Sequence, residues 1–232
     1  MKKHGLISMI GCILILFYTH GALSPSVSSW AGSTEKDNQL SLDDILGHVE
    51  KRYAIAGFSA RFYQTLTLKA MDIIDTASGK AFFKRPGMMR WEYEKPDRQV
   101  IVTDSDKLWI YRPEDNQVLI GKSPSFFAGG KGASFLSDMN MIRKKFDITL
   151  QQKTADGQYV LKLVPGEKSL DITTIYITIS SATFNIVKIT TYNSYGDETA
   201  IKLKDIQFAA KPDDALFRFT IPDGVDVLQL DE

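Results

Sequence analysis

The sequence predicts a mainly β protein with one amphipathic helix at the start, built as a strongly curved antiparallel sheet or an incomplete barrel. Three observations indicate this class. Apolar residues first recur at helical spacing and then, from Phe58 onward, at every second position. Short alternating segments continue to residue 221, separated by turn residues such as Pro86-Gly87 and Asp156-Gly157. One glycine-rich segment, at 123–132, interrupts the succession of strands.

The first residues have the composition of an export signal. They are basic, and residues 6–18 form an apolar run that is too short to span a bilayer as a mature helix. Small residues suited to a signal peptidase occur at 19–21 and again at 29–31. We interpret residues 1–31 as a cleaved signal with its flanking segment, its end falling between residues 21 and 31. Residues 32–39 then form a linker, and 40–232 remain for a single domain.

Cysteine, histidine and net charge exclude several classes of function. Cys12 lies inside the signal, and its surroundings resemble a lipidation box only loosely, so the mature chain has no thiol chemistry. His48 is the single histidine beyond the signal region, which excludes a multi-histidine metal site. Without Lys2 and Lys3 the chain has 26 basic and 28 acidic residues, a formal charge of −2. This balance gives no electrostatic reason to expect nucleic-acid binding.

The predicted helix begins after Ser41 and runs toward Gly57. Ser41 and Asp44 fit a capping box, and Leu40 and Ile45 fit its hydrophobic staple. His48 falls beside the apolar stripe and is predicted to be a surface residue. The stripe itself consists of Leu42, Ile45, Leu46, Val49 and Tyr53.

The remaining segments alternate between apolar and polar residues, as strands with one buried face do. The glycine-rich interruption is predicted to be a mobile flap, followed by a short helix through Phe135, Leu136 and Met139. Its glycine spacing does not fit a phosphate-binding loop. The predicted strands are 58–69, 80–85, 88–94, 99–103, 107–112 and 117–120, then 146–150, 158–164, 171–180, 184–192, 199–208 and 217–221.

The stretch FKRPGMMRWEY, residues 83–93, contains the most informative motif. Arg85 shares a strand side with Phe83 and ends against a Pro-Gly turn, so it is expected at the rim of the interior. Beyond the turn, Met89, Trp91 and Tyr93 share one side. Together with Phe62 and Phe83, and with some of Trp109, Ile110 and Tyr111, they either pack a barrel solid or line an adaptable apolar cavity.

Four blocks carry a resemblance to a known family. They are GFSARFYQ at 57–64, FKRPG with RWEYEKP within 79–96, VTDSDKLWIYRP at 102–113, and FRFTIPDGV at 217–225. With them the chain resembles the LolA-type periplasmic carriers of outer-membrane lipoproteins, strongly over 57–113 and loosely over 121–210. One departure is the turn at residues 104–107, Asp-Ser-Asp-Lys, where the family usually turns through Asp-Gly.

The resemblance implies an unclosed β-barrel with a short helical lid over an apolar cavity, acting in the periplasm as a soluble monomer without a cofactor. Its implied cargo is the acyl chains of lipoproteins, taken from an inner-membrane ABC transporter and passed to an outer-membrane receptor. Arg85 matches the lid-latching arginine of the family. The implied cavity residues are Phe62, Phe83, Met89, Trp91, Tyr93, Trp109 and Tyr111, and the implied lid residues are Phe126, Phe127, Phe135, Leu136 and Met139.

Two other functions are weighed against the carrier. The first is a periplasmic sensor of lipids or lipoproteins built on the same half-barrel, which would bind a regulatory partner. The second is a hydrolase using carboxylates such as Asp104 and Asp106. Turn chemistry accounts for both aspartates, and the mature sequence offers no set of nucleophile, base and oxyanion donors. The carrier is therefore the preferred prediction.

Overall fold

A computed structural model of the chain describes residues 40–123, 133, 135–136, 139–208 and 212–230, which lie within the unit Gln39–Glu232. Most of the described residues belong to the strands of one sheet, and only a few short helices lie between the strands along the chain. The elements are α1 (Leu42–Tyr53), β1 (Gly57–Leu68), β2 (Ile73–Lys84), β3 (Met88–Lys95), β4 (Gln99–Asp104), β5 (Lys107–Arg112), β6 (Gln117–Lys122), α3 (Asn140–Lys145), β7 (Phe146–Lys153), β8 (Gln158–Pro165), β9 (Thr174–Ser180), β10 (Ile186–Tyr192), β11 (Glu198–Gln207), the 3-10 helix η2 (Asp214–Phe217) and β12 (Asp226–Gln229).

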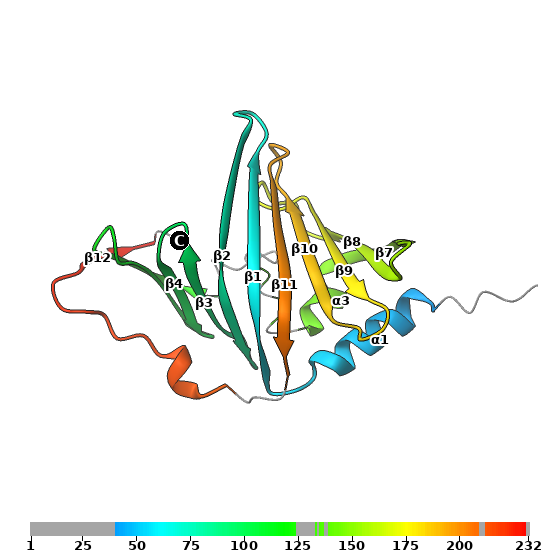
Figure 1. Cartoon of the computed structure of the whole chain (residues 1–232), viewed down its shortest axis with the longest axis horizontal. Coiled ribbons are helices and arrows are strands. Elements are labelled where there is room, and N and C mark those ends of the chain that lie inside the picture. Colours follow the sequence, from blue (N-terminus) through cyan, green and yellow to red (C-terminus); the bar gives the residue numbers. More distant parts are fainter. Residues whose placement is uncertain (1–39, 124–132, 134, 137–138, 209–211, 231–232) are drawn as a thin grey trace, which may run out of the picture. The chain divides into compact units, whose positions relative to one another are not determined.

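The strands form one curved sheet that does not close (Figure 1). Their order is β12, β6, β5, β4, β3, β2, β1, β11, β10, β9, β8, β7, so β12 and β7 are the two edges in the described part of the chain. Neighbouring strands are antiparallel except β12, which pairs with β6 in parallel. The prediction of a mainly β, unclosed half-barrel sheet with an N-terminal helix is confirmed.

Helix α1 begins where its capping residues predicted. The Asp44 backbone N–H donates to the Ser41 hydroxyl oxygen at 3.1 Å, and the Ser41 backbone N–H donates to the Asp44 carboxylate at 3.1 Å. This reciprocal pair satisfies two of the N–H groups that a helix start leaves unpaired. The predicted stripe is buried at Ile45, Leu46, Val49 and Tyr53, while His48 is exposed.

The β1–β2 hairpin is longer than predicted. Strand β2 begins at Ile73, seven residues before the predicted start, and pairs with β1 from Gly57 opposite Lys84 to Leu68 opposite Ile73. Residues 73–76 are all exposed. No side of this part of the strand is buried, so the sequence has no apolar and polar alternation that would predict a strand here. The pairing of residues 73–76 with β1 extends the hairpin well above β3 in Figure 1, whereas β11 follows β1 as far as Thr67.

The C-terminal segment differs most from prediction. No strand forms at 217–221; η2 ends at Phe217, extended chain follows, and the last strand is β12. Phe217 is 1% exposed, since the segment lies against one face of the sheet instead of continuing it. The Lys84 ammonium donates to the Pro212 carbonyl at 3.1 Å and pairs with Asp214, and the Arg90 guanidinium donates to the Leu216 carbonyl at 3.2 Å.

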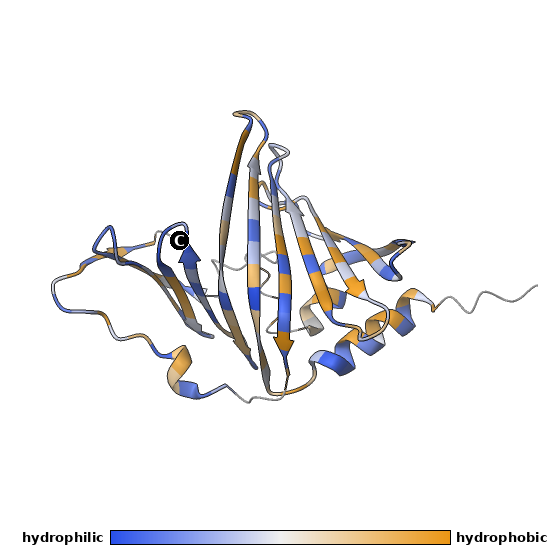
Figure 2. Ribbon diagram, viewed as in Figure 1, coloured by the Kyte–Doolittle hydropathy of each residue, from blue (hydrophilic) through white to orange (hydrophobic). Residues whose placement is uncertain are grey.

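The two faces of the sheet have separate apolar layers. We call the face that carries Phe62, Phe83 and Trp91 the inner face; its residues form one buried cluster with α1 and with Phe135, Leu136, Met139 and Ile142. Val102 and Val118 are buried but lie outside this cluster, on the outer face, and Phe217 of the C-terminal segment is buried on the same side. Figure 2 shows the alternation that separates the two layers, clearest along β11.

Candidate functional site

The inner face carries a cluster of aromatic rings from β1, β2 and β3. Cross-strand pairing places Phe62 opposite Gly79, and Trp91 opposite Ala81. The Phe62 ring meets Trp91 edge to face at 4.9 Å between centroids. A Cβ on Gly79 would lie 2.9 Å from the Phe62 ring and 1.9 Å from the Glu92 carbonyl oxygen. Glycine is therefore required for the Phe62 ring to cover β2 at this point.

Five of the seven predicted cavity residues lie together on this face. Phe62, Phe83, Met89 and Trp91 are at most 3% exposed. Tyr93 is half-buried; its ring meets Phe62 at 4.8 Å, and its hydroxyl donates to the Gln64 side-chain oxygen at 3.0 Å. Burial raises the pKa of Tyr93 to about 12 because the phenolate would lose its hydration. These residues present a largely apolar surface with the Tyr93 hydroxyl at its margin.

The structure corrects the prediction for Trp109 and Tyr111. On β5 it is Leu108 and Ile110 that join the inner-face cluster. Trp109 and Tyr111 alternate with them and therefore face outward, where their ring centroids lie 6.4 and 5.6 Å from that of Phe219 in the C-terminal segment. Both sides of this strand are apolar, so the sequence did not determine which side faced inward.

We call residues 123–139, between β6 and α3, the insertion, and its described apolar residues cover the inner face. Phe135, Leu136 and Met139 are 0%, 3% and 3% exposed and belong to the same cluster as Phe62 and Trp91. The predicted lid residues Phe126 and Phe127 lie outside the described residues. Helix α3 follows at Asn140–Lys145, later than the helix predicted through Phe135–Met139.

Helix α3 is tied to α1 by ion pairs. The Arg143 guanidinium donates to Asp43 at 2.8 Å and also to Glu50, and both carboxylates belong to α1. These contacts raise the pKa of Arg143, first through the hydrogen bond to Asp43. The insertion thus returns to the sheet beside the N-terminal helix.

Arg85 directly follows β2, at the end of the strand where the inner-face aromatics begin. Its side chain is half-buried, and its backbone N–H donates to the Ala56 carbonyl oxygen at 3.0 Å. The turn after it is supported from β4–β5, because the Ser105 hydroxyl donates to the Pro86 carbonyl at 2.6 Å. Ser105 has a φ of +91°, in the region that favours glycine. The sequence Asp104-Ser105, where the family usually has Asp-Gly, therefore still forms a turn. Its serine hydroxyl adds a hydrogen bond to the Pro86 carbonyl, next to Arg85.

Asp104 has a structural role in the same turn. Its carboxylate accepts the backbone N–H groups of Asp106 at 3.0 Å and of Lys107 at 2.8 Å, as aspartates in turns commonly do. Among the residues that the structure describes, no group of three or more His, Cys, Asp or Glu side chains can hold a metal ion. Within the same ranges, no helix has the length and apolar character needed to cross a membrane.

An unclosed antiparallel sheet with an apolar inner face, covered by a helix and an inserted segment, defines the class of half-barrel binding proteins. The family model described as "Outer membrane lipoprotein carrier protein LolA" matches residues 54–220. The chain belongs to this family.

Curated relatives agree with this assignment, and a solved structure shares the fold. The outer-membrane lipoprotein carrier protein of Hahella chejuensis is 25% identical over 204 residues, 88% of this chain and 95% of that protein. The carrier protein of Legionella pneumophila (strain Lens) is 31% identical over 180 residues, 77% of this chain and 86% of its own. An uncharacterized conserved protein from Thermus thermophilus shares the fold with a TM-score of 0.54 and 15% identity, covering 82% of this chain and all of that one.

Proposed function

We propose that this chain is a periplasmic carrier that binds the acyl chains of lipoproteins released from the inner membrane and delivers them to an outer-membrane receptor. The observation that carries the proposal is the apolar inner face, buried beneath Phe135, Leu136 and Met139 in a chain of the LolA family. Relatives named outer-membrane lipoprotein carrier proteins support it. Residues 40–232 constitute the carrier domain, after a signal at 1–31 and a linker at 32–39.

The energetics of acyl binding explain why such a face is covered when the carrier holds no cargo. Three long acyl chains have about 45 methylene groups, and burying each is worth about 0.8 kcal/mol. Full transfer would exceed about 20 kcal/mol, the practical ceiling of non-covalent affinity. Cargo bound without any opposing cost would not be released. Displacing the insertion residues from the inner face opposes binding, so a receptor needs only a modest excess of affinity.

Arg85 is proposed to latch the insertion closed. A guanidinium has five N–H donors in a fixed plane and can hold several backbone carbonyls at once. The support is positional: Arg85 ends the strand that carries Phe83, and the Ser105 hydroxyl steadies the turn that follows.

The carrier is proposed to work as a monomer between two membrane partners. The sequence has no nucleotide-binding loop, so the free energy for extracting cargo from the inner membrane comes from the ABC transporter that supplies it. The outer-membrane receptor accepts the cargo by differential affinity.

Native mass spectrometry tests the proposal directly. The protein is purified from the envelope of cells that co-express a tagged lipoprotein, or the same lipoprotein with its acylated cysteine replaced by alanine. A stoichiometric complex that requires the acylated form supports the carrier function. Recovery of cargo-free protein, or of protein holding only phospholipid, overturns it in favour of a different lipid-binding role.

A further inference from the structure

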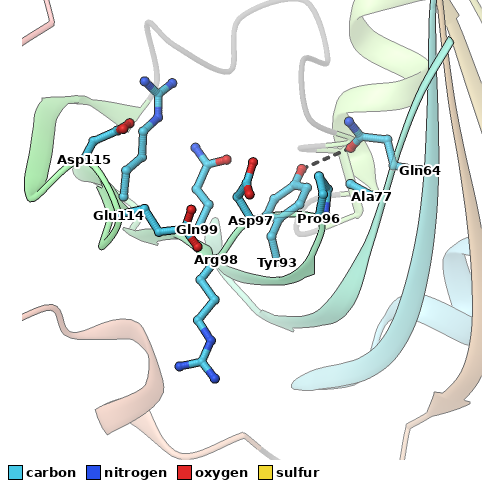
Figure 3. A pocket seen from close by; sticks show the side chains of 10 residues that line it. Gln64, Ala77, Tyr93, Pro96, Asp97, Arg98, Gln99, Glu114 and Asp115 are labelled. Carbon is cyan, nitrogen blue, oxygen red and sulfur yellow. Dashed lines mark hydrogen bonds between the residues drawn. The ribbon is translucent and has the colours of Figure 1, made fainter.

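A polar pocket of about 360 Å³ lies at the end of the inner face where β3 turns into β4 (Figure 3). Four strands contribute polar side chains to it: Gln64 on β1, Tyr93 on β3, Gln99 on β4 and Arg112 on β5. Arg85 follows the other end of β2, eight residues beyond Ala77, which also lines the pocket. At about 3.3 Å per residue, the pocket and Arg85 are separated by most of the length of the sheet.

The inner face changes from apolar to polar next to this pocket, between two successive inward-facing residues of β3. Trp91 is buried, and Tyr93, two residues along β3, places its ring against Phe62 and its hydroxyl on Gln64. At the opposite end, rings of Tyr53, Phe58, Phe83 and Phe208 pack with centroids 4.6 to 5.4 Å apart. An amphiphile lying on this face therefore places its polar end at the pocket, where four strands supply polar side chains, and its apolar end toward the aromatic cluster, which Arg85 and Arg52 border.

The pocket offers hydrogen-bond donors to such a polar end. The Gln64 side-chain oxygen accepts the Tyr93 hydroxyl, which leaves the Gln64 amide N–H groups as donors. Figure 3 shows Gln64 and Gln99 on the two sides of Tyr93. The Gln99 amide and the Arg112 guanidinium complete a set of N–H groups suited to ester and amide carbonyl oxygens.

The charges around the pocket disfavour a phosphate. Asp97, Glu114 and Asp115 line it against two arginines, Arg98 and Arg112, so its formal charge is −1. In Figure 3, Arg98 extends away from the other labelled side chains. We propose that this pocket receives the neutral ester and amide junction between the acyl chains and the first peptide bonds of an acylated polypeptide, and that its carboxylates select against phospholipid head groups. The inference rests on the proposed carrier function and gives it a means of specificity.

A competition experiment tests the selectivity. Wild-type protein and variants are incubated at low salt with mixed micelles holding equal amounts of a triacylated cysteinyl peptide and phosphatidylglycerol of matched acyl length. Native mass spectrometry then gives the ratio of the two bound lipids. The pocket variant is Asp97→Asn/Glu114→Gln/Asp115→Asn. The control is Asp147→Asn/Asp156→Asn/Glu167→Gln, which makes the same charge change at exposed positions outside the pocket.

We expect the wild type to hold mainly the lipopeptide. The pocket variant should shift the ratio toward phosphatidylglycerol by roughly eightfold, since each of the three exposed charges is worth about a factor of two at low salt. The control variant should shift it by less than about twofold. Equal shifts in the two variants, or a wild type that binds both lipids alike, overturn the inference. A wild type that binds phospholipid but no lipopeptide overturns the carrier function itself.

The donors are tested by lipopeptide affinity alone. Gln99→Leu/Arg112→Met should weaken binding about tenfold, from two lost hydrogen bonds, whereas Arg218→Met, at an exposed position outside the pocket, should leave it unchanged. Unchanged affinity in the double variant would remove these side chains from the site.

Discussion

Tyr93 stands at the boundary between apolar and polar surface, and its ionisation should be visible in alkaline stability. Its pKa is raised by burial to about 12, above the value of about 10 expected in an unfolded chain. The folded state therefore favours the neutral phenol. This contribution is complete below pH 10 and is lost as the pH rises from about 10 to 12.

We predict that Tyr93→Phe flattens the fall in stability over that range. The wild type should lose up to about 1.4 kcal/mol per pH unit more than the variant between pH 10 and 12. Urea unfolding at successive pH values measures the difference. Other tyrosines and lysines titrate in both proteins and so cancel. Parallel curves would show that Tyr93 ionises as freely in the folded protein as in the unfolded chain.

Arg85 is the proposed latch, so its removal should affect cargo transfer more than stability. We predict that Arg85→Leu keeps the unfolding free energy within about 1 kcal/mol of wild type, since the residue is only half-buried. Hydrogen exchange in α3 should become faster, and transfer of lipopeptide to the receptor should be impaired. The control is Arg218→Leu, at an exposed position of the C-terminal segment. Normal transfer by Arg85→Leu would exclude the residue from the mechanism.

At the scale of elements, local signals predicted structure well and long-range pairing escaped prediction. Helix α1 was recognised because the Ser41 cap and its apolar stripe are encoded within a few turns of chain. The early part of β2 was missed because Ile73–Thr76 are exposed and are held by pairing to β1. Sequence periodicity does not report such pairing.

The C-terminal segment shows the same limit more strongly. The alternation in FRFTI at 217–221 is that of a strand, but the segment crosses the outer face and only β12 joins the sheet. Its position depends on Lys84 and Arg90, more than a hundred residues earlier. The aromatic part of the site was predictable from alternation in β1 to β3. The orientation of Trp109 and the polar pocket were not, because both depend on which strands become neighbours.

The outer-face segment is predicted to be a permanent part of the core. Phe217→Ala should lower the unfolding free energy by about 3–5 kcal/mol, because the ring is 1% exposed and its loss leaves a cavity. Leu228→Ala, at a side chain 48% exposed in β12, should cost within about 0.5 kcal/mol. Urea denaturation measures both. A small effect at Phe217 would mean that the segment is only loosely held on the sheet.

For the whole molecule, the two apolar layers should respond differently to cargo. The outer layer consists of strand residues such as Val102 and Val118 together with Phe217 of the C-terminal segment, and it has no part in the proposed acyl binding. The inner layer is covered by the insertion, which in this mechanism competes with cargo for the same surface. Stability and affinity are then coupled on the inner face and independent on the outer face.

This coupling predicts opposite effects for Phe135→Ala. The 0%-exposed ring stabilises the cargo-free state, so its removal should lower the unfolding free energy of that state by about 3–5 kcal/mol. The same change removes part of the free energy needed to displace the insertion from the inner face. A larger fraction of the protein is then open and able to bind, so lipopeptide affinity should rise about tenfold or more. Phe217→Ala is the matched control, equally destabilising but without effect on affinity. Thermal unfolding with and without lipopeptide measures both quantities in one experiment. If Phe135→Ala lost stability while its affinity stayed at the wild-type value, the ring would belong to a permanent core, and the insertion would not be the element that cargo displaces.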